Sequence, residues 1–148
     1  MSPAELIGLL GRQQQALREV AELAQRQREA LRQGRLDVLQ DLLSRMGQVA
    51  FTAQQAEADR DTAARALAVS CGVEPRLSAL VEALGEDEGK ALAEAGDGLM
   101  RAVASVKSEM EILTRLMKES SSLNEMLLAE WQRLQGGMTS AGRFDARG

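Results

Sequence analysis

The sequence predicts an all-α protein, an elongated antiparallel bundle of long helices with a short helix between the second and the last long helices. Ala, Glu, Lys, Leu and Arg account for 78 of the 148 residues, a share typical of long-helix proteins. Apolar residues recur at alternating intervals of three and four, which is the heptad pattern of packed helices. No stretch alternates apolar and polar residues as a strand does, and only Phe51, Trp131 and Phe144 are aromatic.

The first long helix is expected over residues 2–34. Ser2 is suited to cap its N-terminus, Pro3 fits the first helical position, and Glu5 completes a capping box. Gly34 is the expected C-terminal stop. The heptad positions that should face a partner helix are Leu6, Leu10, Gln13, Leu17, Val20, Ala24, Gln27 and Leu31.

The second long helix should begin between Arg35 and Asp37 and run to about Ser70, because Asp37 favours the positive end of the helix dipole. Its middle is rich in alanine, which buries little apolar area, so we expect looser packing there. That middle contains Ala56, Arg60 and Ala63, and the stronger seam consists of Leu36, Leu39, Leu43, Met46, Ala50, Ala53 and Leu67.

A short helix is expected after Pro75, ended by Gly85 and an acidic turn at residues 86–89. The last long helix is expected over residues 98–135, and residues 90–95 join it either continuously or through a bend at Gly96 and Gly98. The apolar residues of the short helix are Leu77, Leu80, Val81 and Leu84.

The last long helix has a wider apolar surface than a two-helix seam requires, which indicates that it binds more than its own fold. Its flanking stripe consists of Ile112, Leu116, Leu123 and Met126. Its main stripe consists of Leu99, Val103, Val106, Met110, Leu113, Met117, Ser120, Asn124, Leu127, Trp131 and Leu134.

The chain divides into one helical bundle domain, residues 1–135, and a flexible C-terminal tail, residues 136–148. Gly136 and Gly137 break the helical pattern, and no apolar period follows them. Phe144 is the only aromatic residue of the tail. It is either an evolutionary remnant or a residue that docks on a partner.

Charge and composition argue against several classes of partner. The formal net charge is −4 without a concentrated basic block or a cationic helix face, which argues against a nucleic-acid-binding or membrane-surface protein. No apolar run approaches the roughly 20 residues that span a bilayer, and no leader peptide precedes the first helix, so we expect a cytoplasmic protein. Cys71 is the only cysteine and is expected to be a small buried hydrophobe rather than a reactive thiol.

The sequence also argues against an enzyme. It contains no histidine, which removes Ser-His and Cys-His nucleophile pairs and imidazole metal ligands, and it contains no phosphate-binding loop. Carboxylates cluster at residues 86–88 and at Asp59 and Asp61, where a solvated surface is the simpler interpretation than an acid/base site. We therefore expect no catalytic residue, no metal and no cofactor.

The order of the elements resembles the FlgN-type flagellar export chaperones. The segment EALRQGRLDVL at residues 29–39 is similar to the first helical hairpin of that family, and LSALVEAL at residues 77–84 is similar to its short helix. Leu127 and Leu128 stand where the last helix of the family carries a leucine pair. The ending FDARG at residues 144–148 resembles the aromatic-acidic-x-x-Gly ending of many such chaperones, with Phe144 in place of Tyr.

The resemblance implies a cytosolic chaperone that binds hook-filament junction proteins, keeps them from premature assembly and delivers them to the flagellar export apparatus. An apolar face that accepts a cargo helix suits this role. One alternative is that the same residues form the core of the bundle. Another is that the chain is a coiled coil that self-associates, for example as a homodimer, with buried Gln13 and Gln27 setting the register. The expected cargo-binding residues are Leu113, Leu116, Met117, Leu123, Met126, Leu127, Trp131 and, in the tail, Phe144.

Overall fold

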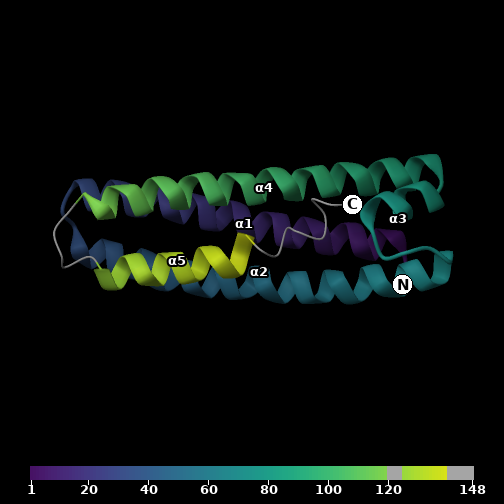
Figure 1. The fold of residues 1–148 in the computed structure, drawn as a ribbon, viewed down its shortest axis with the longest axis horizontal. Helices are drawn as coiled ribbons and strands as arrows, with labels where there is room; N and C mark the ends of the chain where they lie inside the picture. Colours follow the sequence, from purple (N-terminus) through teal and green to yellow (C-terminus); the bar gives the residue numbers. More distant parts are fainter. Residues whose placement is uncertain (120–124, 140–148) are drawn as a thin grey trace.

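Five helices form the part of the chain that the computed structural model describes, which is residues 1–119 and 125–139. The long helices α1 (Pro3–Arg32), α2 (Leu36–Cys71) and α4 (Glu86–Lys118) pack side by side into an elongated body in which α2 runs antiparallel to the other two (Figure 1). The short helix α3 (Leu77–Ala83) and the helix α5 (Glu125–Thr139) lie toward opposite ends of this body. The predicted all-α bundle with a short third helix is confirmed.

The ends of the first two helices follow the sequence signals. The Ser2 hydroxyl accepts a hydrogen bond from the Glu5 backbone N–H at 3.2 Å, and Pro3 occupies the first turn of α1. At the other end Gly34 adopts a positive φ of 69°, and the Arg35 N–H reaches back to the Ala30 carbonyl at 2.9 Å. The chain reverses into α2 at this residue. Glycine is favoured here because a side chain is disfavoured in the left-handed conformation.

The core is a seam of leucine, alanine and methionine along the three long helices. Seven of the eight heptad positions expected in α1 are buried, and Leu31 is half-buried. In α2 the expected register is wrong at its start, because Leu36 is 53% exposed whereas Leu42 is buried. Leu43 is only half-buried, so the helix turns Leu39, Leu42 and Met46 toward α1.

The acidic segment at residues 86–89 was expected to be a loop turn between helices. This expectation is wrong, because the segment forms the first helical turn of α4. Gly85 is the N-cap, and the carboxylates of Glu86, Asp87 and Glu88 follow it at the positive end of the helix dipole. The helix then passes through Gly96 and Gly98 without interruption, so the continuous alternative is the correct one. Both glycines are buried against neighbouring helices, which explains their place inside a helix.

The single last helix expected over residues 98–135 is instead two helices. α4 ends at Lys118, and α5 turns back to pack on α4 and α2 (Figure 1). A heptad pattern of apolar residues predicts which residues face a partner, but it does not predict whether the helix is continuous. Met117 and Trp131 therefore fit one stripe although they lie on different helices. Ser120, Leu123 and Asn124 lie outside the described residues.

α5 also extends past the expected boundary at Gln135. Gly136, Gly137 and Met138 are helical, and Met138 is buried. A Cβ at Gly137 would lie 2.7 Å from the Gln54 side-chain nitrogen, so a glycine here lets α5 approach α2 closely. The remaining part of the predicted tail, residues 140–148, lies outside the described residues.

Candidate functional site

The apolar side of α5 packs into the groove between α2 and α4. Trp131, Leu134 and Met138 are buried, and Leu127 and Leu128 are half-buried. The Trp131 indole N–H donates a hydrogen bond to Gln27 Oε1 at 2.6 Å, and Gln27 Nε2 donates to the Met46 sulfur at 3.5 Å. A buried polar chain therefore joins α5, α1 and α2.

The helix α4 supplies the other wall of this contact. Leu113 and Met117 are buried beside α5, whereas Leu116 is half-buried on the flanking face. Of the residues expected to bind cargo, Leu113, Met117 and Trp131 thus belong to the core of this structure, and Leu116 and Leu127 lie at its edge. The side chains of Leu123, Met126 and Phe144 are outside the described part.

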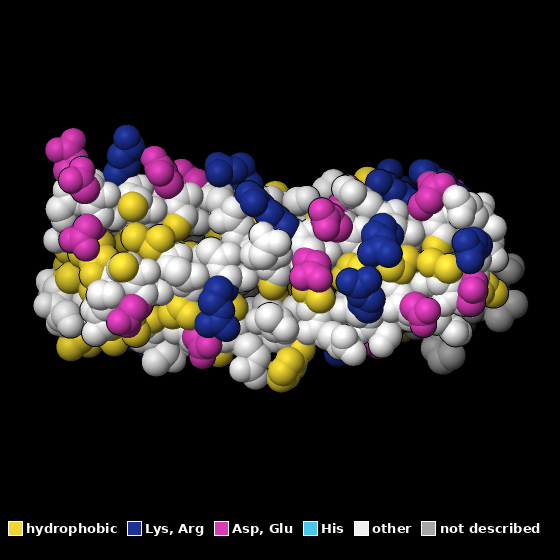
Figure 2. All heavy atoms as spheres, turned by 180° about the vertical axis from the view of Figure 1, so that it is seen from behind, with side chains coloured by type: hydrophobic (Ala, Val, Ile, Leu, Met, Phe, Trp, Pro, Cys, Tyr) yellow, Lys and Arg dark blue, Asp and Glu magenta, His cyan; other side chains and the backbone are white. Residues whose placement is uncertain are grey.

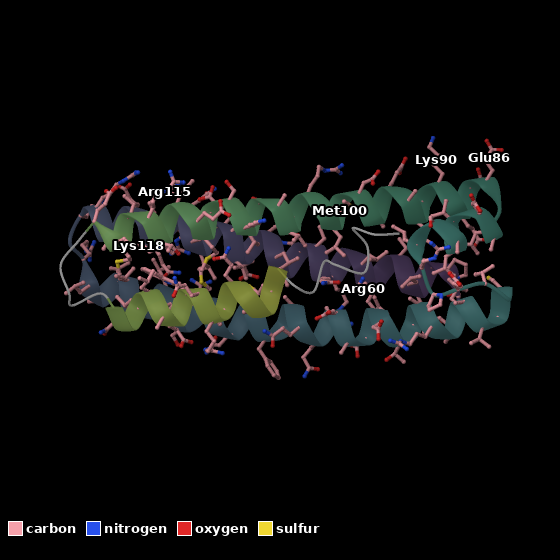
Figure 3. The ribbon with its side chains drawn as sticks, viewed as in Figure 1. Arg60, Glu86, Lys90, Met100, Arg115 and Lys118 are labelled. Atoms are coloured by element: carbon pink, nitrogen blue, oxygen red, sulfur yellow. The ribbon has the colours of Figure 1, made fainter. Side chains whose placement is uncertain are left out.

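A shallow groove separates the outer sides of α4 and α5, but its lining is polar. Arg115 and Lys118 project from α4 there (Figure 3). Such a lining does not suit an apolar cargo helix, so the buried side of α5 is the better candidate. The groove is lined by Glu111, Thr114, Arg115, Lys118, Gln132 and Gln135.

Charged residues of both signs are distributed over the surface. On the face shown in Figure 2, positive and negative side chains alternate, and apolar side chains gather toward the end that carries α3. Arg28 pairs with Glu109 at 3.3 Å, and Gln25 donates to the same carboxylate, which joins α1 to α4. On α5 the Arg133 guanidinium hydrogen-bonds Glu130 and lowers the pKa of that carboxyl group.

Gln13 and Gln27 are both fully buried inside the chain's own bundle. In a self-associating coiled coil they would set the register between two chains, yet Gln27 hydrogen-bonds Met46 and Trp131 of its own chain. Sequence reasoning missed Gln27 as the polar partner of Trp131. The indole N–H of a buried tryptophan needs a hydrogen-bond acceptor. The amide of Gln27, at a buried heptad position of α1, was the sequence signal for that acceptor.

Two absences hold for residues 1–119 and 125–139. No group of three or more His, Cys, Asp or Glu side chains is arranged to hold a metal ion within these ranges. None of the helices within them combines the length and the apolar character that a bilayer crossing needs.

Comparison with known proteins identifies the family. The family model described as FlgN protein matches residues 1–141, which is nearly the whole chain. No characterised protein and no solved structure is similar enough to match. The family consists of flagellar export chaperones for the hook-associated proteins and not of enzymes. Because this match covers residues 1–141 of a chain of 148 residues, we conclude that the chain belongs to the FlgN family.

Proposed function

We propose that this chain binds a helical segment of a hook-filament junction protein on the face of α2 and α4 that α5 covers, and that α5 gives way to it. The observation that supports this site is the position of α5. It packs as a separate fourth helix on a body made by the three long helices, with its apolar side inward. A cargo helix with a similar apolar stripe can take the same place.

Several properties of α5 favour its displacement. It has only 15 residues, and helices of that length are marginal in isolation. Gly136 and Gly137 lie inside it, and each glycine lowers helix stability by roughly 1 kcal/mol relative to alanine. Among the α5 side chains that the structure describes, three are buried, those of Trp131, Leu134 and Met138. The long helices of the body bury many more.

The face under α5 suits an apolar helix of variable sequence. Leu113 and Met117 on α4 and Met46 on α2 line it, and methionine side chains adapt to differently shaped partners. Leu116 borders this face, and Leu127 and Trp131 on the displaced α5 are free to cover the cargo from the other side. Leu123 and Met126 belong to the same proposed surface through their place in the sequence.

The chaperone acts in the cytoplasm, before its cargo enters the export apparatus. Handover to that apparatus releases the cargo, and no nucleotide or other cofactor takes part. Membership of the FlgN family supports both statements. A homodimer of the free chain is a second possibility that the same experiment measures.

Size-exclusion chromatography with light scattering tests the proposal. Wild type, Leu116→Glu and Val69→Glu are each mixed with a hook-filament junction protein from the same genome. Val69 is 83% exposed near the far end of α2 and is the matched control for an added carboxylate. We expect a complex with wild type and Val69→Glu and none with Leu116→Glu at unchanged helicity. Equal binding by all three contradicts the proposed site.

A further inference from the structure

One polar side chain faces α5 from inside the body. Gln27 of α1 is 0% exposed, and its amide lies where α5 covers the groove between α2 and α4 (Figure 1). The amide oxygen Oε1 accepts a hydrogen bond from the Trp131 indole N–H at 2.6 Å, and Nε2 donates to the Met46 sulfur at 3.5 Å. The donor for Oε1 therefore comes from α5, the helix that cargo displaces in the function proposed above.

Met46 fixes which end of the Gln27 amide faces α5. A thioether sulfur accepts hydrogen bonds weakly and has no hydrogen to donate. The NH₂ group of Gln27 therefore points toward α2, because the opposite orientation would place the amide oxygen against the sulfur without a donor. The acceptor Oε1 is left facing the position of α5. Any helix that occupies this position consequently meets a buried acceptor.

The core residues around this amide are apolar. The ion pair of Arg28 with Glu109, at 3.3 Å, places the adjoining turn of α4 at the level of Gln27, and the buried residues of that turn are Met110 and Leu113. The nearest other buried residues of α1 are Leu23, Ala24 and Ala30. None of these five side chains carries an N–H or O–H group, so none can replace the indole as a donor. A cargo helix with only apolar side chains would leave Oε1 buried without a donor, which weakens binding.

We propose that Gln27 is a specificity-determining residue of the cargo site and that the cargo helix carries one side-chain N–H donor, of tryptophan, asparagine or glutamine, within its apolar stripe. This donor takes the place of the Trp131 indole on Gln27 Oε1. A cargo helix shifted by one turn buries both the donor and Oε1 unpaired, so the pair also sets the axial register of the cargo. The inference rests on the function proposed above and gives the chemistry of its partner.

Trp131→Phe measures what α5 contributes to the competition with cargo. In the free chain this variant leaves Gln27 Oε1 without a donor, whereas in the complex α5 is displaced and the change has no effect on the site. The affinity for a hook-filament junction protein from the same genome, measured by isothermal titration calorimetry, should therefore rise roughly tenfold. An affinity equal to that of wild type would show that α5 stays in place, which contradicts the proposed function and with it this inference.

Gln27→Leu in the Trp131→Phe background tests the donor on the cargo. The free chain gains from this change, because it loses a buried acceptor that has no donor. The complex loses, because the donor of the cargo is then buried without an acceptor. The affinity should therefore fall by at least about tenfold relative to Trp131→Phe alone. An unchanged affinity overturns the donor and leaves displacement of α5 standing, because a cargo helix without a donor gains from Gln27→Leu as much as the free chain does.

Gln13→Leu in the same background is the matched control. Gln13 lies on the heptad stripe of α1 two heptads before Gln27 and is also fully buried, and no described residue hydrogen-bonds its side chain. The control removes an equal amide without removing a contact to α5, so the affinity should equal that of Trp131→Phe. A loss as large as that of Gln27→Leu overturns the proposal, because any buried amide would then give the same effect. Circular dichroism verifies that the variants keep their helicity.

Substitutions on the cargo test the pairing from the other side. Each tryptophan, asparagine and glutamine in the helical segment of the hook-filament junction protein is replaced by leucine in turn. One replacement should weaken binding to Trp131→Phe by roughly tenfold and restore binding to the chain that also carries Gln27→Leu, because both partners of the pair are then absent. If no replacement has this double effect, the proposed donor is wrong. This test does not depend on the stability of the Gln27→Leu chain, because the same chain is compared with two forms of the cargo.

Discussion

Trp131 and Gln27 are 104 residues apart in the chain and are joined in the core by a hydrogen bond of 2.6 Å from the indole nitrogen to the amide oxygen. Both residues are fully buried. The bond orients the largest apolar side chain of α5 and holds it against α1. This contact fixes the position of α5 along the body formed by α1, α2 and α4.

Gln27→Leu should destabilise the chain by about 1–3 kcal/mol, because it leaves the Trp131 N–H buried without an acceptor. Chemical denaturation followed by far-ultraviolet circular dichroism measures this loss. An unchanged midpoint would show that the Trp131 N–H finds another acceptor and that the bond does not hold α5.

Trp131→Phe in the Gln27→Leu background provides the matched control. Removing both partners leaves no unsatisfied indole, so the double variant should lose less stability than the two single variants predict together, by about 0.5–3 kcal/mol. Strict additivity of the two changes would mean that the residues do not interact energetically.

Gly89→Ala should destabilise the packing of α3 on α4 by about 1–3 kcal/mol, because the helices approach too closely for a side chain. A Cβ at Gly89 would lie 2.6 Å from the backbone carbonyl oxygen of Val81, which cannot turn aside as a side chain can. Thermal unfolding measures the effect. A variant as stable as wild type would contradict the close approach.

Gly11→Ala is the control for that substitution and should stabilise the chain by roughly 1 kcal/mol. Gly11 lies inside α1, and nothing is within 4 Å of a Cβ added there. Alanine therefore restricts the unfolded chain and improves helix propensity without a clash. A loss of stability in this variant would mean that another group contacts α1 at Gly11 and clashes with the added methyl group.

The ion pair on α5 makes one prediction about pH. Hydrogen bonding from Arg133 lowers the pKa of Glu130, so the pair contributes stability above the unfolded pKa of glutamate, and this is lost as the pH falls through the lowered value. Both side chains are well exposed, so the effect on stability is small. In an NMR titration the midpoint of the Glu130 carboxyl should rise in Arg133→Ala. Identical midpoints would show that the pair does not form in solution.

Local signals predicted the first hairpin well. Ser2, Pro3 and Gly34 mark helix ends through backbone chemistry that does not depend on the rest of the fold, and α1 begins and ends beside them. The α1 heptads identified the centre of the buried face but not its full width, because α1 packs against both α2 and α4. The additional buried residues of α1 are Ala16, Ala21, Leu23 and Ala30. In α2 the error lies at the start of the helix, where Leu36 was assigned to the seam although it is exposed. The alanines assigned to the middle of α2 are buried as expected.

The last third of the chain required tertiary information. Leu113 and Trp131 share a heptad stripe, but only packing shows that α5 folds back so that both are buried. Three consecutive serines at residues 120–122 have low helix propensity and were the available signal for the interruption. Gly137 was interpreted as a helix stop, whereas its missing side chain accommodates Gln54.

Displacement of α5 by cargo is the central claim, and a covalent lock tests it most directly. Cysteines at Gln54 and Gly137, in a chain with Cys71→Ala, stand where α2 and α5 touch, and an added oxidant joins their two thiols in a disulfide. Binding of a hook-filament junction protein is then measured by light scattering with the lock closed and after reduction of the disulfide. The account predicts no complex in the closed form and full binding in the reduced form of the same chain. A complex of equal affinity in both forms would contradict it and would place the cargo on a surface that α5 does not cover.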